Sequence, residues 1–397
     1  MTHENVGLDA LLASLTREFA ARAAEHDRDA SFPFENIERL HHLGLLSLTV
    51  SPDFRGGQPS AFGGDEPNLG LAAQAVRAVA QGEPSTALVL VMQYIFQYSI
   101  GRTQQWPTHL RARVQEDAVR SGALINALRV EPELGTPARG GLPATLARRT
   151  QEGWRLSGHK LYSTGIPALT WLAVWGRSDE DEPRVGTFLV HRQTPGVRVV
   201  ETWDHLGMRA SGSHDVIFED VLIPLDHAVD IRPQAAWANG LPADEAAWIV
   251  VLLSALYDGV ARSARDWFVA FAGARTPSNL GAPLSSLARF QEAVGAIDAL
   301  LLTNAALLKN IADAVARGDY PAADDSNLVK YIVTKNAIEA VETAIRFSGN
   351  HGLARANPLE RHYRDVLCSR IHTPQNDAIL ASAGRRAFAE LQLNGAA

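Results

Sequence analysis

Cysteine is almost absent from this chain. Cys368 is the single cysteine among 397 residues, so an intrachain disulfide and a cysteine-based metal site are both excluded. The amino-terminal segment MTHENVGLDALL also lacks the basic and then apolar layout of a secretory signal peptide. We therefore expect a cytoplasmic protein that holds no metal.

Positive charge and long apolar runs are likewise scarce. Lysine and arginine number 37 against 44 aspartate and glutamate residues, the net charge is −7, and no basic block stands out. A nucleic-acid partner is therefore not expected. The longest apolar run, residues 246–257, has 12 residues, fewer than the roughly 20 needed to cross a bilayer. The run predicts a buried core helix and no membrane span.

The chain does contain many apolar residues with a clear periodicity. Hydrophobic residues make up 46% of the sequence, enough to bury a large core in two or three domains. Apolar residues recur at helical spacing through residues 1–120 and again through 240–397. Residues 121–231 alternate in short runs rich in Val, Ile, Phe and Trp. This pattern predicts an α+β protein with a helical domain, a β-domain of short antiparallel strands and a helical bundle.

The expected bundle helix at 326–347 is apolar on more than one face. A helix that is apolar beyond a single stripe must be covered on both sides. We therefore predict a homotetramer formed by packing of the bundles. The apolar positions that need cover are Leu328, Ile332, Val333, Ala337, Val341 and Ile345.

Three strings in this order resemble the acyl-CoA dehydrogenase superfamily: EGWRLSGHKLYSTG, DHLGMRASGSHDVIFEDVLIP and FSGNHGLARANPLERHYRD. The resemblance covers nearly the whole chain, so it is more specific than any single motif. It implies an N-terminal helical domain, a central antiparallel β-barrel and a C-terminal four-helix bundle. It also implies a bound flavin, FMN or FAD, and usually a homotetramer.

The YST segment at the end of a predicted strand is suited to contact a flavin. Hydroxyl side chains and backbone amides at strand ends supply the donors and acceptors that the flavin edge needs. Taken alone, Ser163 and Thr164 could equally be ordinary turn hydroxyls. The resemblance favours flavin contact by Tyr162, Ser163 and Thr164.

The resemblance also suggests residues for the phosphate-bearing arm of the flavin. A phosphate needs cations, helix amino termini or a close approach of the backbone, which glycine permits. The positions that correspond to such contacts in the family lie in the bundle: Arg275, Gln291, Gly349 and Gly352.

The residue that removes a proton in family dehydrogenases is missing from its usual place. Those enzymes carry a glutamate in a segment of the form Ile-Tyr-Glu-Gly-Thr, whereas this chain has Ile-His-Thr-Pro-Gln at 371–375. The hydroxyl of Thr373 cannot accept that proton at neutral pH. A minority of family dehydrogenases place the glutamate on the first long bundle helix, where the register puts Ile249 and leaves Glu245 one turn away. An absent base and a base displaced to Glu245 therefore remain alternatives.

The histidine in this segment resembles the flavin-dependent monooxygenase branch of the superfamily. That branch includes two-component aromatic hydroxylases, the dibenzothiophene sulfur monooxygenase and amino-sugar N-oxygenases. It implies reduced flavin delivered by a separate flavin reductase, and oxygen transfer through a C4a-hydroperoxyflavin. A histidine with a pKa near ~6.5 can give or take the proton that this chemistry needs. The residues at matching places are Tyr94, Asn126, Ser163 and His372.

The segment NALRVEPELG departs from the dehydrogenase pattern. It keeps Glu131 and Pro132 but has Arg129 and Val130 where small polar residues would contact flavin or substrate. Whether a coenzyme A thioester is bound therefore stays open, as does the identity of the substrate. The preferred hypothesis is a two-component monooxygenase; a dehydrogenase with a displaced base and a catalytically silent flavin-binding protein are the alternatives.

Overall fold

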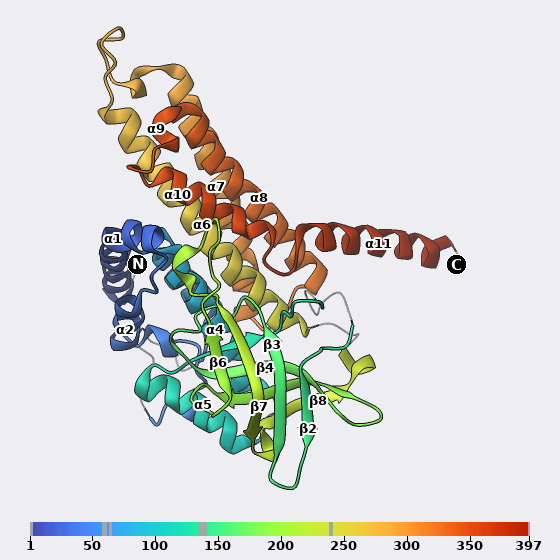
Figure 1. The fold of residues 1–397 in the computed structure, drawn as a ribbon. Coiled ribbons are helices and arrows are strands. Elements are labelled where there is room, and N and C mark those ends of the chain that lie inside the picture. The colour runs from blue at the N-terminus through green and yellow to red at the C-terminus, as the bar shows by residue number, and fades with distance from the viewer. Residues whose placement is uncertain (1–2, 58–61, 63–65, 135–140, 238–240, 396–397) are drawn as a thin grey trace.

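Helices, strands and helices follow one another in three blocks along the chain (Figure 1). The computed structural model describes every residue except 1–2, 58–61, 63–65, 135–140, 238–240 and 396–397. The first block is helical, as expected from the sequence. Its helices are α1 (His3–Asp29), α2 (Phe34–His42), α3 (Leu69–Gly82), α4 (Pro84–Arg102) and α5 (Thr108–Ser121).

Helix α4 is the buried centre of this first block and packs against α3, the bundle and the sheet. Its start is well specified by the sequence. The Glu83 carboxylate accepts hydrogen bonds from the backbone amides of Ser85 and Thr86, and Pro84 occupies the first helical position. Apolar side chains on all sides of α4 then allow it to be enclosed.

The second block is an eight-stranded sheet. Its alternating burial matches the alternation of apolar residues in the sequence, for example along β3 and β7. The strands are β1 (Leu124–Leu128), β2 (Leu146–Arg149), β3 (Trp154–Lys160), β4 (Leu169–Ser178), β5 (Arg184–His191), β6 (Val197–Val200), β7 (Asp215–Ile223) and β8 (Ala228–Pro233).

The sheet is open and mixed, so the predicted closed antiparallel barrel is wrong in these two details. The strand order is β6-β7-β3-β2-β4-β5-β8, and no pairing among the described residues joins β6 to β8. Strands β1 and β2 both run parallel to β4, β1 beside residues 169–174 and β2 beside residues 177–178. Alternation identifies a strand but not the direction of its neighbour, which is why the sequence missed the parallel pairs.

The third block is the helical bundle. Helices α6, α7 and α8 pack together, α10 crosses α6 and α8, and α11 extends away from the body of the molecule (Figure 1). The predicted fold class, helical domain followed by sheet and bundle, is therefore confirmed. The bundle helices are α6 (Ala243–Ala274), α7 (Ala288–Ala316), α8 (Ala323–Ser348), α9 (Asn350–Leu353), α10 (Leu359–Leu367) and α11 (Asn376–Gly395).

Helices α6 and α7 are each long and apolar enough to cross a membrane by length and composition. In α6, 83% of the most apolar window is buried inside the fold, as expected for the core helix predicted at 246–257. In α7 only 28% of that window is buried.

On α8, Val333, Ala337 and Val341 are buried within the chain, whereas Ile332 remains 37% exposed.

Candidate flavin site

The turn between β3 and β4 carries the predicted flavin contacts of the YST segment. Tyr162 adopts a left-handed backbone conformation with φ of 55°, and Gly165 follows with φ of 79°. Two backbone hydrogen bonds hold this turn against the segment before β7: the amide of Ser163 donates to the His214 carbonyl at 3.1 Å, and that of Gly165 to the Ser211 carbonyl at 2.9 Å. Residues 162–165 are therefore held in one defined conformation.

Two of the predicted residues, Asn126 and Thr164, are brought together at this turn. The Asn126 side-chain amide, on β1, donates to the carbonyl of Thr164 at 3.0 Å. The Thr164 hydroxyl lies 2.9 Å from that of Ser213, which in turn lies 2.7 Å from the hydroxyl of Ser211. Residues of the LGMRASGS string and of the YST string thus form one polar group.

Ser163 has a buried hydroxyl that finds no hydrogen-bond partner among the described residues. A buried polar atom without a partner costs about 1–3 kcal/mol, so such atoms usually mark a ligand or water site. Beside it, Tyr162 is 52% exposed and lies against the rings of Trp203 and His205. An unpaired hydroxyl, an exposed aromatic ring and a fixed turn fit the edge of a flavin.

Tyr94 is buried in the middle of α4, and its hydroxyl also lacks a partner within the described part of the chain. Burial raises the pKa of this phenol, so it stays protonated at any physiological pH. No described contact joins it to Ser163 or His372. Its predicted catalytic role therefore stays a prediction.

A buried ion pair stabilises the end of β3, which leads into the turn. Lys160 and Glu131 are 0% and 2% exposed, and their charged groups lie 2.6 Å apart. Glu131 also accepts the backbone amides of Ala144 and Thr145, while Lys160 also donates to the Trp175 carbonyl. Burial lowers the pKa of Lys160 to about 8, although the carboxylate opposes this. The pair fixes the end of β3 immediately before the turn.

His372 lies in the turn that joins α10 to α11, at the place where the sequence predicted a polar interruption. Its Nδ1 atom is 2.6 Å from the hydroxyl of Tyr257, a buried residue of α6. Burial raises the pKa of the Tyr257 phenol, so the hydroxyl keeps its proton and can donate it to Nδ1. Burial and the charge of Lys330 lower the pKa of His372 to about 4. At neutral pH the imidazole is therefore neutral, and in the tautomer that accepts the Tyr257 hydroxyl its own proton lies on Nε2.

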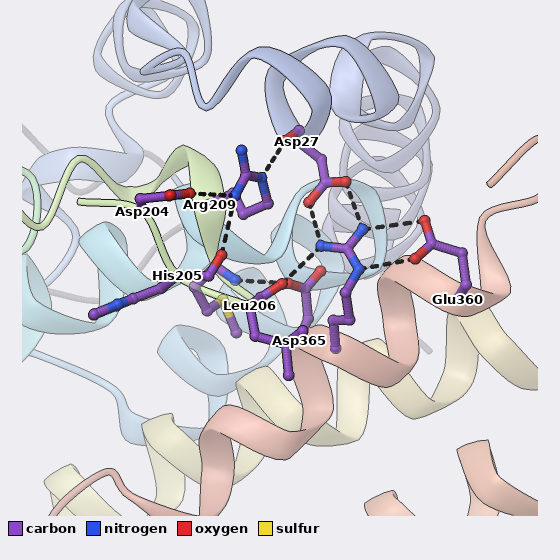
Figure 2. A network of polar contacts seen from close by, with 9 residues as sticks. Asp27, Asp204, His205, Leu206, Arg209, Glu360 and Asp365 are labelled. Carbon is purple, nitrogen blue, oxygen red and sulfur yellow. Dashed lines mark hydrogen bonds and ion pairs between the residues drawn. The ribbon is translucent and has the colours of Figure 1, made fainter. Parts of the chain in front are cut away.

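An ionic network fixes the bundle and the first helix around the site (Figure 2). Arg364 of α10 pairs with Asp27 of α1 at 2.6 Å and with Glu360 at 2.8 Å. Arg209, next to the polar turn, donates to the Asp27 carbonyl at 2.7 Å. These ion pairs and hydrogen bonds thus connect the helical domain, the sheet domain and the bundle at Asp27.

Asp365 connects the polar turn to the part of the bundle that carries His372. It accepts the backbone amide of Met208 at 2.7 Å (Figure 2), and Met208 lies three residues before Ser211. Burial raises the pKa of Asp365 to about 7, against the effect of that hydrogen bond. No hydrogen bond within the described residues joins His372 directly to Asn126 or Thr164. Among the described residues, the hydrogen bond from Met208 to Asp365 connects the two regions through α10.

The dehydrogenase base has two possible positions in the sequence, and the structure shows both. Thr373 is exposed and offers no basic group. Glu245 lies at the start of α6, accepts a hydrogen bond from the Ser99 hydroxyl at 3.2 Å, and is half-buried. Burial raises the pKa of Glu245, and the neighbouring charge of Asp244 raises it further, whereas the Ser99 hydrogen bond lowers it. Ile249 contributes only an apolar side chain.

Arg129 lies near Glu245 and takes the place of a small polar residue of the dehydrogenase pattern. Its guanidinium is stacked on the ring of Trp175, 4.4 Å from the ring centroid. Arg129 is solvent-exposed, and it lies close enough to Glu245 for the two charges to attract each other. A bulky cation therefore occupies the region where the family pattern would put small hydroxyls.

The four residues predicted to bind the flavin phosphate lie at the opposite end of the bundle from the sheet. Arg275 follows the last residue of α6 and is exposed, and the Gln291 amide donates to the Ser285 carbonyl at 3.0 Å. Gly349 has φ of 57°, and a Cβ atom on Gly352 would lie 2.3 Å from the Ser348 hydroxyl. Figure 1 shows α9 and the connection between α6 and α7 at the end of the bundle away from the sheet.

Three residues of the site were not found from the sequence: Tyr257, Lys330 and Asp365. Tyr257 ends the apolar run 246–257, which gave no sign of a polar function. Lys330 lies on a helix with several other charged residues, and nothing in the sequence indicates that it alone is buried. Asp365 belongs to the quoted LERHYRD string, which gave the only available signal.

Comparison with known proteins places the chain in a family. Residues 129–221 match the acyl-CoA dehydrogenase middle domain, and residues 251–376 match the acyl-CoA dehydrogenase C-terminal domain. The chain is 32% identical over 383 residues to the putative acyl-CoA dehydrogenase YdbM of Bacillus subtilis, with 95% of each chain covered. It is 30% identical over 386 residues to the L-evernosamine nitrososynthase of a Micromonospora species, with 90% of this chain and 83% of that protein covered.

A similar solved structure is KijD3 in complex with FMN and an amino-sugar nucleotide. It has a TM-score of 0.78 and 27% sequence identity, with 98% of this chain and 95% of that chain covered. The FMN in that complex agrees with the flavin predicted here from the sequence, and the resemblance to the superfamily is confirmed. The chain belongs to the acyl-CoA dehydrogenase family.

Proposed function

We propose that this protein is a flavin-dependent monooxygenase that uses reduced flavin and O₂ and obtains the reduced flavin from a separate reductase. The observation that carries the proposal is the hydrogen bond between Tyr257 and His372. It puts a neutral imidazole in the segment where family dehydrogenases carry their carboxylate, and the next residue, Thr373, has no basic group. Bound reduced flavin would supply two electrons, so that one oxygen atom enters the substrate and the other leaves as water.

The residues of the chain have separate roles in this proposal. His372 offers an Nε2–H donor that can hold a proton at the reacting oxygen, because Tyr257 occupies Nδ1. Ser163 offers its unpaired hydroxyl to the flavin, and Asn126 holds the carbonyl of Thr164 in place. Tyr94, Ser163 and Tyr257 are fully buried, which limits the access of stray water to these groups.

We propose further that one flavin is bound by two copies of the chain. Helix α6 rises about 25 Å from Tyr257 to its end beside Arg275, at about 1.5 Å per residue. The four residues predicted to bind the flavin phosphate are therefore better placed to reach a flavin at the YST turn of another subunit than one at the YST turn of their own chain. The mostly exposed apolar face of α7 and the exposed Phe388 and Leu391 of α11 provide surface for such packing. This supports the predicted homotetramer; the cytoplasmic location stays a prediction.

Two comparisons support the class of reaction but leave the substrate open. One relative is named for the synthesis of a nitroso group on an amino sugar, and KijD3 was solved with an amino-sugar nucleotide. Arg129, with no carboxylate in ion-pair distance among the described residues, offers a cation for an anionic group of a substrate. FMN and FAD remain equally open for this chain.

The proposal is tested by mixing anaerobically reduced flavin and protein with O₂ in the presence of candidate amines, aromatic compounds and organic sulfides. We expect oxygenated product in place of hydrogen peroxide with at least one substrate class. Oxidation of reduced flavin entirely to peroxide with every class, together with weak flavin binding, would favour the catalytically silent reading.

A second candidate function is an acyl-CoA dehydrogenase with a displaced base. It is favoured by Glu245, whose half-buried carboxyl has a raised pKa beside the start of α6, and by the similarity to YdbM. Anaerobic bleaching of bound oxidised flavin by acyl-CoA thioesters, lost in Glu245→Gln and retained in His372→Ala, would establish this function in place of the monooxygenase.

A further inference from the structure

Lys330 is a fully buried lysine of the bundle that the proposed reaction has not yet used. It lies on α8 and is 0% exposed. Within the described residues, no carboxylate lies in ion-pair distance of its ammonium group, so its partners are all neutral. A buried ammonium without a counter-ion is costly and is retained only where its hydrogen bonds compensate.

All hydrogen bonds of the Lys330 ammonium go to one short segment. Its three donors are directed to the carbonyls of Ser369 at 3.3 Å, His372 at 2.8 Å and Pro374 at 2.6 Å. An ammonium group has three N–H donors, so all of them are satisfied by this turn. The segment is also held by the hydrogen bond between Tyr257 and His372 and by backbone bonds from residues 371 and 372 to the Cys368 carbonyl. Lys330 is thus the main link between the turn and α8.

The same ammonium is a positive charge beside an imidazole. It touches the carbonyl of His372, and its charge adds to burial in lowering the pKa of that residue. The described titratable groups around His372 are Tyr257 of α6 and Lys330 of α8. Asp365 of α10 and Cys368 of the following turn raise the pKa of Tyr257 further. Among the described residues, Lys330 is the group whose positive charge lowers the pKa of this imidazole.

We propose that Lys330 is a positioning residue, whose ammonium group fixes the turn that carries His372 and places a positive charge beside the imidazole. Tyr257 of α6 and Lys330 of α8 then both hold His372, the first at Nδ1 and the second at the backbone carbonyl. A neutral imidazole that accepts from Tyr257 presents Nε2–H as a donor in a fixed direction, whereas a protonated one would donate from Nδ1 to the phenol oxygen. The significance of this for oxygen transfer rests on the proposed function.

The test measures His372 itself in flavin-free protein, by NMR of ¹³C-labelled histidine. The resonance is assigned with His372→Asn. Lys330→Met removes the charge at similar side-chain length, and Lys330→Gln removes the charge while keeping donors. The matched control is Lys335→Met, an exposed lysine on the same helix. Amide exchange of residues 369–374 reports on the turn.

We expect the pKa of His372 to rise by about one pH unit or more in both Lys330 variants and to stay unchanged in Lys335→Met. Amide exchange in the turn should accelerate most in Lys330→Met. A folded Lys330→Met or Lys330→Gln protein with wild-type His372 pKa and wild-type exchange in the turn overturns the inference. Should Lys330→Met not fold, Lys330→Gln decides alone.

A second readout connects the inference to the reaction. Product formed per reduced flavin consumed should fall about tenfold or more in Lys330→Met, as expected when an acid–base group loses its position. If no variant, including the wild type, oxygenates any substrate while His372 still responds to Lys330, the proposed function fails and the inference about Lys330 stands.

Discussion

Replacing Tyr257 by phenylalanine removes one oxygen atom and with it the hydrogen bond that fixes His372. The bond is 2.6 Å long, and Tyr257 is fully buried, so no water readily replaces the hydroxyl. Leaving a buried imidazole nitrogen unpaired costs about 1–3 kcal/mol. If the whole cost goes into freeing the ring from its fixed orientation, the fraction of molecules with His372 in that orientation falls by a factor of about 5 to 150.

The assay for Tyr257→Phe is coupling, the amount of oxygenated product per reduced flavin consumed. We expect coupling to fall within that range, hydrogen peroxide to rise by the corresponding amount, and flavin affinity to stay close to wild type. Tyr331→Phe is the matched control, because the Tyr331 hydroxyl makes no hydrogen bond within the described residues. Wild-type coupling in Tyr257→Phe, with coupling still dependent on His372, would refute the orienting role of Tyr257.

Three further predictions concern the turn and its supports. Replacing Ser163 and Thr164 together by valine should weaken flavin binding by about 1–3 kcal/mol with the melting temperature kept, and unchanged affinity in a titration would make the turn purely structural. Lys160→Met leaves the Glu131 carboxylate buried without its partner and should lower the free energy of unfolding in urea by about 3–5 kcal/mol. This loss should exceed that of the double variant with methionine at both positions. A smaller loss than in the double variant would contradict the prediction. Because the folded pKa of Asp365 is raised to about 7, the folded state binds its proton more tightly, so this carboxyl reduces stability as pH rises from about 4 to 7. The free energy of unfolding of Asp365→Asn, minus that of wild type, should therefore be larger at pH 8 than at pH 5 in urea titrations. The same difference at both pH values would refute this.

The order of blocks was predictable because periodicity is a local property of the sequence. Helical spacing before residue 120 and after residue 240, and alternation between them, follow directly from which faces are buried. The direction of β1 and β2 beside β4 was not predictable, since strand alternation carries no information on partners. The open edges of the sheet depend on the same pairings and were missed for the same reason.

The candidate site was predictable only where motifs place residues on one turn. Asn126 and Thr164 do meet, and His372 does interrupt the helices of the bundle. The partners Tyr257 and Lys330 come from two other helices, and their contacts with the His372 turn depend on how α6 and α8 pack. A tyrosine in an apolar run and one lysine among several give no local signal of such packing.

The most direct test of the monooxygenase proposal is the coupling of His372→Ala, measured on protein whose melting curve matches wild type. If His372 holds a proton at the reacting oxygen, this variant should bind reduced flavin nearly as well as wild type. It should yield about 10²–10⁴-fold less oxygenated product per reduced flavin, with hydrogen peroxide in its place. Unchanged coupling would show that the imidazole is not catalytic, contradict the account, and transfer attention to Glu245 and the dehydrogenase function.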